Sequence, residues 1–153
     1  MTEFYNTQEP IKPQTLQALE EVWCFGLTND YREFLLTHNG GRPKEPCFNF
    51  KGEEDGSTID KFFGIYKDYN SNLLLRLELL KDRIVDEAFP IARDVFGNVI
   101  CLIVKGKRRG QIYFWDHETE ADTDQGERPN YSNMTLIADS FSEFIDGLSE
   151  GKD

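Results

Sequence analysis

An unbroken apolar run, VICLIV at residues 99–104, constrains the fold of this chain most strongly. Because a strand with one solvated face alternates apolar and polar residues, this run predicts a strand covered on both faces. KGKRRG at 105–110 carries a glycine at 106 and at 110 and predicts a turn. QIYFWDH at 111–117 then predicts a second strand that pairs back in a hairpin.

Apolar residues at helical spacing predict helices on both sides of this hairpin, at residues 13–25, 28–41, 71–84 and 139–148. Shorter apolar segments predict strands at 47–52, 59–66 and 134–138, and residues 90–98 lead into the hairpin through a glycine-containing turn. Helices gather at both ends and β-structure fills the middle, which indicates an α+β fold rather than alternating β-α-β units. The 153 residues contain no repeat or linker and predict one domain over 1–153, with a core of about 11–148 and short polar termini.

Local sequence features also predict which helix face is buried and how the helices begin and end. The first helix is expected to bury one face that contains Leu16, Leu19, Val22 and Trp23. Thr28 is expected to cap the start of the second helix, and Asn39 with two glycines to end it. Ser140 and Glu143 have the spacing of a capping box at the start of the last helix.

Charge and composition exclude several classes of function. Lys and Arg total 17 against 28 Asp and Glu, a formal net charge of -11, so direct binding to nucleic acid or to an anionic membrane is not expected. No apolar stretch approaches the ~20 residues that a membrane span needs, and the N-terminus lacks the pattern of a secretory signal. The charge permits a basic partner, since opposite charges speed encounter, but it also serves solubility alone.

The cysteines indicate a reducing compartment. The chain has three cysteines, an odd number, and they form no C-x-x-C motif: Cys24, Cys47 and Cys101. Cys24 and Cys101 lie in apolar settings and are expected to be small buried thiols. A cytoplasmic location therefore fits best.

Motifs for catalysis are absent from the sequence. It has no G-x-S-x-G elbow, no H-E-x-x-H, no P-loop and no G-x-G-x-x-G, so no enzyme activity, cofactor or metal is expected. His38 is expected at the end of the second helix in a capping or surface role. His117 borders an acidic run, and a single histidine beside flexible acids is weak support for a metal site. The many aromatic residues, among them Phe89, Phe96 and Trp115, are expected in the core.

The acidic run itself lies in GQIYFWDHETEADTD, residues 110–124. In an extended strand its alternate carboxylates would share one face and repel one another, so strand pairing is expected to end near Trp115 or Asp116. DTDQGE fails the calcium-loop pattern, because Gly126 follows the second Asp too closely for a third ligand. Three readings stay open: a hydrated loop, a contact with a protein partner, and a metal site.

Four phrases in order resemble the SUKH superfamily, which includes fungal Smi/Knr cell-wall-synthesis regulators and many bacterial immunity proteins. They are DYREFLLTHNGGRP, FPIARDVFGNVICL, GQIYFWDHE and IADSFSEFIDGL, and they span about residues 15–148. Such sequences often have Leu-Pro before the Asp-Tyr pair, where Leu27 and Thr28 stand here. The resemblance implies an α+β domain with a central, bent, mostly antiparallel sheet and about four flanking helices, and a binding role rather than catalysis.

The leading hypothesis from this resemblance is an immunity protein that neutralises a cognate polymorphic or contact-dependent toxin domain, often a nuclease, by direct binding. A toxin that handles nucleic acid often has a basic surface, which suits a partner of charge -11. The alternatives are a regulatory interaction module of the cell-wall type and, third, a small enzyme or metal-binding protein. The recognisable phrases specify scaffold, so the candidate partner contacts are two acidic stretches: Glu53, Glu54 and Asp55 in one, and Asp116, Glu118, Glu120, Asp122 and Asp124 in the other.

Overall fold

The predicted α+β fold with a central antiparallel sheet is confirmed by a computed structural model, which describes residues 2–67 and 71–151. The sheet has six strands whose order in space follows their order in the chain, each antiparallel to the next. The strands are β3 (Cys47–Asn49), β4 (Gly56–Phe62), β5 (Ala88–Asp94), β6 (Val99–Ile103), β7 (Ile112–Trp115) and β8 (Met134–Ala138).

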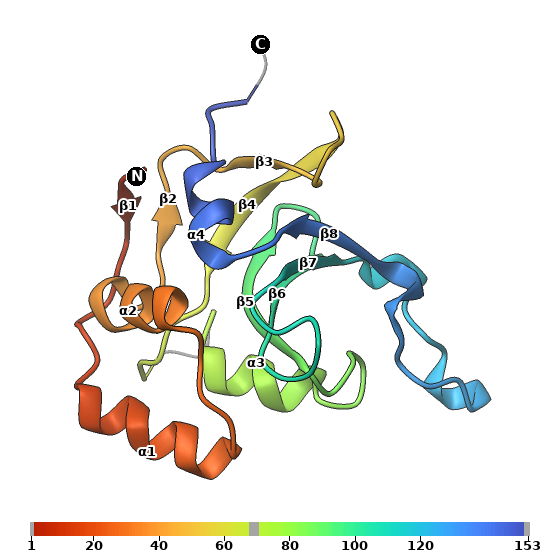
Figure 1. Cartoon of the computed structure of the whole chain (residues 1–153), viewed down its shortest axis with the longest axis horizontal. Helices are drawn as coiled ribbons and strands as arrows, with labels where there is room; N and C mark the ends of the chain where they lie inside the picture. The colour runs from red at the N-terminus through yellow and green to blue at the C-terminus, as the bar shows by residue number, and fades with distance from the viewer. Residues whose placement is uncertain (1, 68–70, 152–153) are drawn as a thin grey trace.

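The sheet is strongly bent, as Figure 1 shows. Its register shifts between Ile59 and Lys61, between Pro90 and Ala92, and between Ile112 and Tyr113. Such irregularities increase the local twist and bend the strand that carries them. The bend brings the two edges close enough that the backbone N–H of Lys51, just after β3, donates to the carbonyl of Leu136 in β8 at 2.9 Å. The sheet therefore nearly closes into a barrel.

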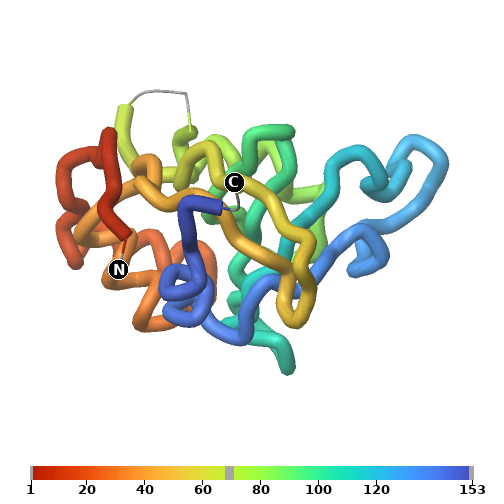
Figure 2. The backbone as a smooth tube through the Cα atoms, turned by 90° about the horizontal axis from the view of Figure 1, so that it is seen from above, coloured from red at the N-terminus to blue at the C-terminus, as the bar shows by residue number. Residues whose placement is uncertain are grey.

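Helices cover both faces of this sheet. Figures 1 and 2 place α2 and α4 on one face and α3 on the other. The helices are α1 (Pro13–Trp23), α2 (Asn29–His38), α3 (Leu73–Leu80) and α4 (Phe141–Asp146), with short 3-10 turns η1 (His117–Thr119), η2 (Thr123–Gln125) and η3 (Tyr131–Asn133). A separate two-stranded ribbon joins β1 (Phe4–Tyr5) to β2 (Arg42–Pro43).

Strand β6 is one of the two central strands of the sheet, and all five of its residues are buried, as the VICLIV run predicts. Two adjacent aromatic residues, Phe62 at the end of β4 and Phe63 after it, pack on opposite faces of the sheet. Phe62 packs against Phe141 and Phe144 of α4, whereas Arg76 of α3 lies over the ring of Phe63. The alternation of side chains along a strand thus distributes one aromatic to each layer.

The end of α1 differs from the prediction. The helix stops at Trp23 because Cys24 adopts a left-handed conformation with φ of 62°. Val22 lies about 120° around the helix from Leu16, whereas Trp23 lies about 20° away, since each residue turns by about 100°. Val22 is 77% exposed and Cys24 is exposed, so both predictions of burial were wrong. Cys101 is buried as predicted, and this burial raises the pKa of its thiol to about 12.

Helix starts were predicted with mixed success. Ser140 caps α4 as predicted, since its hydroxyl accepts from the backbone N–H of Glu143 at 3.0 Å. Thr28 stands at the N-cap of α2, but its side chain caps no backbone amide, so that prediction was wrong. The carboxylate of Asp30 accepts from the N–H of Tyr31 instead, at 2.8 Å.

Two further segments depart from the sequence pattern. Residues 90–98, expected only to lead into the hairpin, contain most of β5, a full strand paired with both β4 and β6. Phe96, expected in the core, is 73% exposed because it lies in the tight turn between β5 and β6. The third helix is also shorter than predicted, from Leu73 to Leu80, although Ile84 beyond its end is buried.

Candidate binding surface

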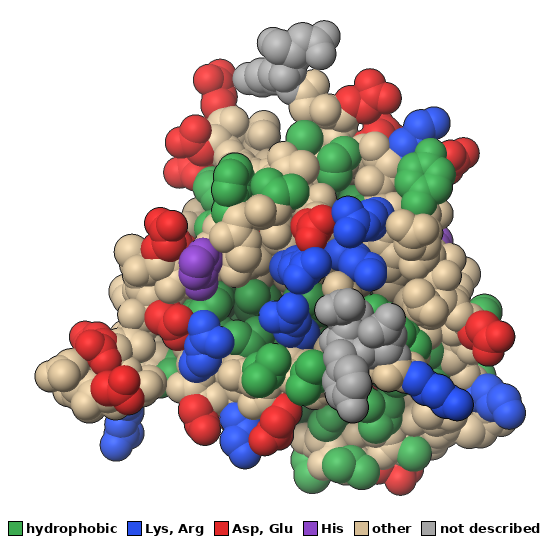
Figure 3. Space-filling view, turned by 180° about the vertical axis from the view of Figure 1, so that it is seen from behind, with side chains coloured by type: hydrophobic (Ala, Val, Ile, Leu, Met, Phe, Trp, Pro, Cys, Tyr) green, Lys and Arg blue, Asp and Glu red, His purple; other side chains and the backbone are tan. Residues whose placement is uncertain are grey.

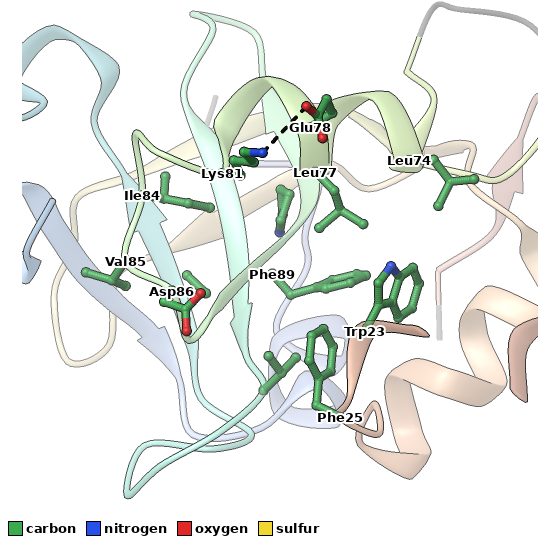
Figure 4. Close-up of a pocket in the computed structure, with 13 residues that line it drawn as sticks. Trp23, Phe25, Leu74, Leu77, Glu78, Lys81, Ile84, Val85, Asp86 and Phe89 are labelled. Carbon is green, nitrogen blue, oxygen red and sulfur yellow. Dashed lines mark ion pairs between the residues drawn. The ribbon is translucent and has the colours of Figure 1, made fainter. Parts of the chain in front are cut away.

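An apolar groove of about 320 Å³ lies between the end of α1, one side of α3 and strand β5. Figure 4 shows the rings of Trp23, Phe25 and Phe89 together, with Leu77 descending from α3 toward them. Trp23 stacks on Phe25 with ring centroids 5.7 Å apart, and both meet the buried Phe89 edge to face, at 5.2 and 5.8 Å. Cys24 adopts a left-handed conformation and ends α1. The chain therefore turns between Trp23 and Phe25, and both rings contact Phe89.

Charged residues at the rim of this groove neutralise one another. Lys81 pairs with Glu78 at 3.8 Å, the contact drawn as a dashed line in Figure 4. Asp86 pairs with Lys105 at 2.7 Å. None of the described residues that line the groove has a histidine, cysteine or hydroxyl side chain. Its chemistry is that of a receptor for an apolar side chain.

The acidic segment, residues 116–124, begins where β7 ends at Trp115, as predicted. Three of its five carboxylates hold the local backbone or an arginine. Asp116 accepts from the N–H of Glu118 at 2.9 Å, and Asp122 accepts from the N–H of Gln125 at 3.2 Å, so each caps a 3-10 turn. Glu120 accepts two hydrogen bonds from Arg83, at 3.0 and 2.8 Å, and these bonds raise the pKa of Arg83.

The other two carboxylates of the segment, those of Glu118 and Asp124, are exposed and form no ion pair within the described part of the chain. Because η1 and η2 turn the chain, the alternate acids do not share one strand face as they would in an extended segment. Among the described residues, no group of three or more His, Cys, Asp or Glu is placed to hold a metal ion.

Arg83 joins the acidic segment to the groove. It lies in the connection between α3 and β5, whose neighbouring residues Lys81, Ile84 and Val85 line the groove. On its other side Arg83 borders a hollow of about 370 Å³ with Glu120 and Asp124. The connection 81–86 thus borders the apolar groove with some of its residues and the acidic segment with Arg83, and we call the groove and the segment together the α3 surface.

The second predicted stretch, Glu53 to Asp55, forms the tip of the hairpin between β3 and β4. All three of its side chains are exposed. Backbone bonds from Phe50 to Asp55 and from Glu53 to Phe50, at 2.8 and 3.0 Å, close the turn. Figures 1 and 2 place this tip away from residues 116–124, so the two acidic stretches do not form one patch.

In the part of the chain that the structure describes, neither histidine belongs to a group of side chains that could hold a metal ion. His38 ends α2 as predicted, and its ring packs between Phe4 and Phe34 with centroids 4.9 and 4.8 Å away. Nε2 of His117 lies 3.0 Å from the carbonyl oxygen of Phe96. The basic turn at 105–110 is likewise occupied, since Arg109 donates to the carbonyls of Val104 and Gly26.

Sequence reasoning found the acidic segment but missed the groove. Trp23 and Phe89 were expected as core, and only the turn at Cys24 leaves the first of them partly open. The sequence signal that could have indicated the groove is the Trp-x-Phe motif of Trp23 and Phe25 at the end of the first helix. In the described residues, no helix combines the length and the apolar character that crossing a membrane requires.

These features define a single-domain α+β protein with a bent antiparallel sheet and an apolar surface groove. A comparison with family models matches residues 10–147 to the SMI1 / KNR4 family (SUKH-1). The match covers most of the chain, and the chain belongs to this family, as the four sequence phrases predict. A comparison with curated proteins finds no match.

Proposed function

We propose that this chain is a non-catalytic, cytoplasmic bacterial immunity protein that binds and neutralises a cognate toxin domain with a basic surface. The observation that carries the proposal is the α3 surface, where an apolar groove lies beside carboxylates that have no partner in the described chain. Membership of the SUKH-1 family supports a binding role of this kind. The net charge of -11 supports a basic partner rather than nucleic acid itself.

The two parts of the surface would do different work. An apolar or aromatic side chain of the toxin would insert between Trp23, Phe25 and Leu77, where desolvated contacts dominate binding energy. Glu118 and Asp124 would attract basic residues of the toxin before contact, since exposed charges act mainly on the association rate. The hairpin acids Glu53 and Glu54 offer the same kind of attraction at a different place.

Co-expression with the toxin domain encoded by a neighbouring gene tests the proposal. We expect relief of toxicity and a stable complex on a sizing column. If toxicity persists and no complex forms, that toxin domain is not the partner. If this result holds for every toxin domain encoded nearby, the immunity role is wrong.

Charge reversal locates the contact. Glu118→Lys with Asp124→Lys is expected to slow association about tenfold at low salt and to reduce its salt dependence. Glu53→Lys with Glu54→Lys changes the net charge equally at the hairpin tip and is the matched control. A larger effect of the hairpin pair would move the interface there.

The resemblance of the sequence to fungal Smi/Knr cell-wall-synthesis regulators supports a second candidate function, that of a regulatory interaction module. Under that alternative, pull-down from the source cells would recover cell-wall or signalling enzymes instead of a toxin. The same α3 surface variants would then weaken that capture.

A further inference from the structure

Basic side chains gather around a carboxylate on the face of the molecule opposite to the view of Figure 1. Figure 3 shows Lys and Arg side chains gathered at the centre of this face around an acidic one. Asp60 of β4 accepts from Nη1 of Arg42 at 3.0 Å and from Nε of Arg93 at 2.9 Å. Lys61 stands directly opposite Arg93 in the sheet register, which sends both side chains to the same face.

Arg76 of α3 completes this basic cluster. Its Cζ lies 5.3 Å from the centroid of the Phe63 ring, which is buried and fixes the position of the guanidinium. Burial lowers the pKa of Arg76, and the positive charge of the nearby Arg93 lowers it further. No carboxylate of the described residues pairs with Arg76 or with Lys61.

The cluster therefore concentrates positive charge in a chain whose total is strongly negative. Like charges directly opposite in a sheet destabilise it, and one carboxylate cannot offset four cations. The basic turn at 105–110 behaves differently, because Lys105 pairs with Asp86 and Arg109 donates to backbone carbonyls. This face therefore carries a local excess of positive charge, and a bound anion would offset it.

We propose that Arg42, Lys61, Arg76 and Arg93 form a binding site for a phosphate group. Guanidinium groups bind phosphate through two parallel N–H···O bonds, and the planar fork of Arg76 is open for this contact. Asp60 holds Arg42 and Arg93 in place, so less side-chain freedom is lost on binding. The surplus charge favours a dianion such as a phosphate monoester over a carboxylate. This site shares no residue with the lining of the groove or with the acidic segment, although Arg76 also lies on α3, and it does not depend on the proposed toxin binding.

Titration of the full-length protein with inorganic phosphate at constant ionic strength tests the site. Expected results are a saturable rise in melting temperature and saturable shifts of the arginine Nε–H signals. Arg76→Gln with Arg93→Gln should weaken phosphate binding about tenfold or more. Lys107→Gln with Arg108→Gln removes the same charge at the 105–110 turn and should leave binding unchanged. If the first pair does not fold, Arg76→Lys keeps the charge and loses the fork, and should still weaken binding.

Three results would overturn the proposal: a response to phosphate that does not saturate, an equal loss of binding in the Lys107→Gln, Arg108→Gln control, or an equal response to acetate. The source of the phosphate is distinguished by two probes, glycerol 3-phosphate and the peptide acetyl-Gly-phosphoSer-Gly-amide. Tighter binding of the first indicates a small metabolite, and tighter binding of the second indicates a phosphorylated protein. Either result supports the site.

Discussion

Arg83 binds the carboxylate of Glu120 through two parallel hydrogen bonds, from Nε to Oε2 at 3.0 Å and from Nη2 to Oε1 at 2.8 Å. Its Cζ also lies 5.5 Å from the centroid of the Trp115 ring. The acidic segment follows β7, and its described residues form no strand. The Arg83–Glu120 pair links this segment to the connection after α3. The position of the exposed carboxylates Glu118 and Asp124 therefore depends on a residue outside their segment.

Arg83→Gln is expected to loosen residues 116–124 locally. Amide hydrogen exchange there should accelerate, while the free energy of unfolding falls by about 1 kcal/mol or less, because the pair is partly solvated. Lys105→Gln breaks the exposed pair with Asp86 and is the matched control, with no effect expected on the segment. Faster exchange across β6 and β7 with an unchanged segment would contradict this role.

Gly56 permits the close approach of β3 and β4. A Cβ at this position would lie 1.8 Å from the carbonyl oxygen of Phe48, so Gly56→Ala must force the two strands apart. We expect a loss of about 2–4 kcal/mol in urea unfolding. Gly52→Ala in the same hairpin meets no atom within 4 Å and bears only the strain of its φ of 73°, about 1 kcal/mol. Equal losses in the two variants would show that strand contact is not the cause.

Asn39 fixes the exit from α2 with its side chain as well as its backbone. Its Nδ2 donates to the carbonyls of Glu9 and Ile65 at 2.8 and 2.9 Å, and its Oδ1 accepts from the N–H of Ile65 at 2.7 Å. Its φ is 49°, in the left-handed region. Asn39→Ala is expected to lose about 3–4 kcal/mol, because the backbone conformation and the bonds are both lost.

Asn39→Gly separates these two contributions. Glycine adopts the left-handed conformation freely, so its remaining loss, about 2 kcal/mol, measures the three hydrogen bonds. Thermal or urea unfolding of both variants checks the prediction. Full stability in the glycine variant would mean that the hydrogen bonds contribute nothing.

Local patterns account for the parts of the fold that were predicted from sequence. The strand β8 has the predicted bounds, and Ser140 caps α4, because each depends on neighbouring residues. The sequence also indicated that Asn39 ends α2, since Asn followed by Gly-Gly is a common helix end. Its bonds to Glu9 and Ile65 were not predictable, because they join segments 26 and 30 residues away.

The binding surfaces show the same limit. The acidic segment is contiguous and was predicted, whereas the groove needs Trp23 and Phe89 to meet across the fold. The basic cluster needs α3 to bring Arg76 beside Phe63, which follows β4, and strand register to bring Lys61 opposite Arg93. In the sequence, these cations are scattered between residues 42 and 93, and only the folded sheet with α3 collects them.

Asp30 links the starts of α2 and α4 and gives a pH-dependent contribution to stability. Its Oδ2 accepts from the N–H and the hydroxyl of Ser142, at 3.0 and 3.1 Å. Burial alone would raise the pKa of Asp30, but the nearby hydroxyl of Thr28, with the hydrogen bonds from Ser142 and Tyr31, outweighs it and lowers the pKa below its usual value. A lowered pKa means that the stabilisation is present above the unfolded value and is lost as pH falls through the folded one.

Asp30→Asn should therefore reduce the free energy of unfolding by about 1 kcal/mol at neutral pH, and the difference from the unchanged protein should shrink below about pH 4. Urea unfolding at several pH values measures this difference. Asp146→Asn is the matched control, because Asp146 ends α4 and accepts no side-chain hydrogen bond from the described residues. Its effect should be zero or slightly stabilising, since the negative end of the helix dipole repels a carboxylate at the helix C-terminus. A constant difference for Asp30→Asn down to the acid transition would show that its charge does not hold the two helices together.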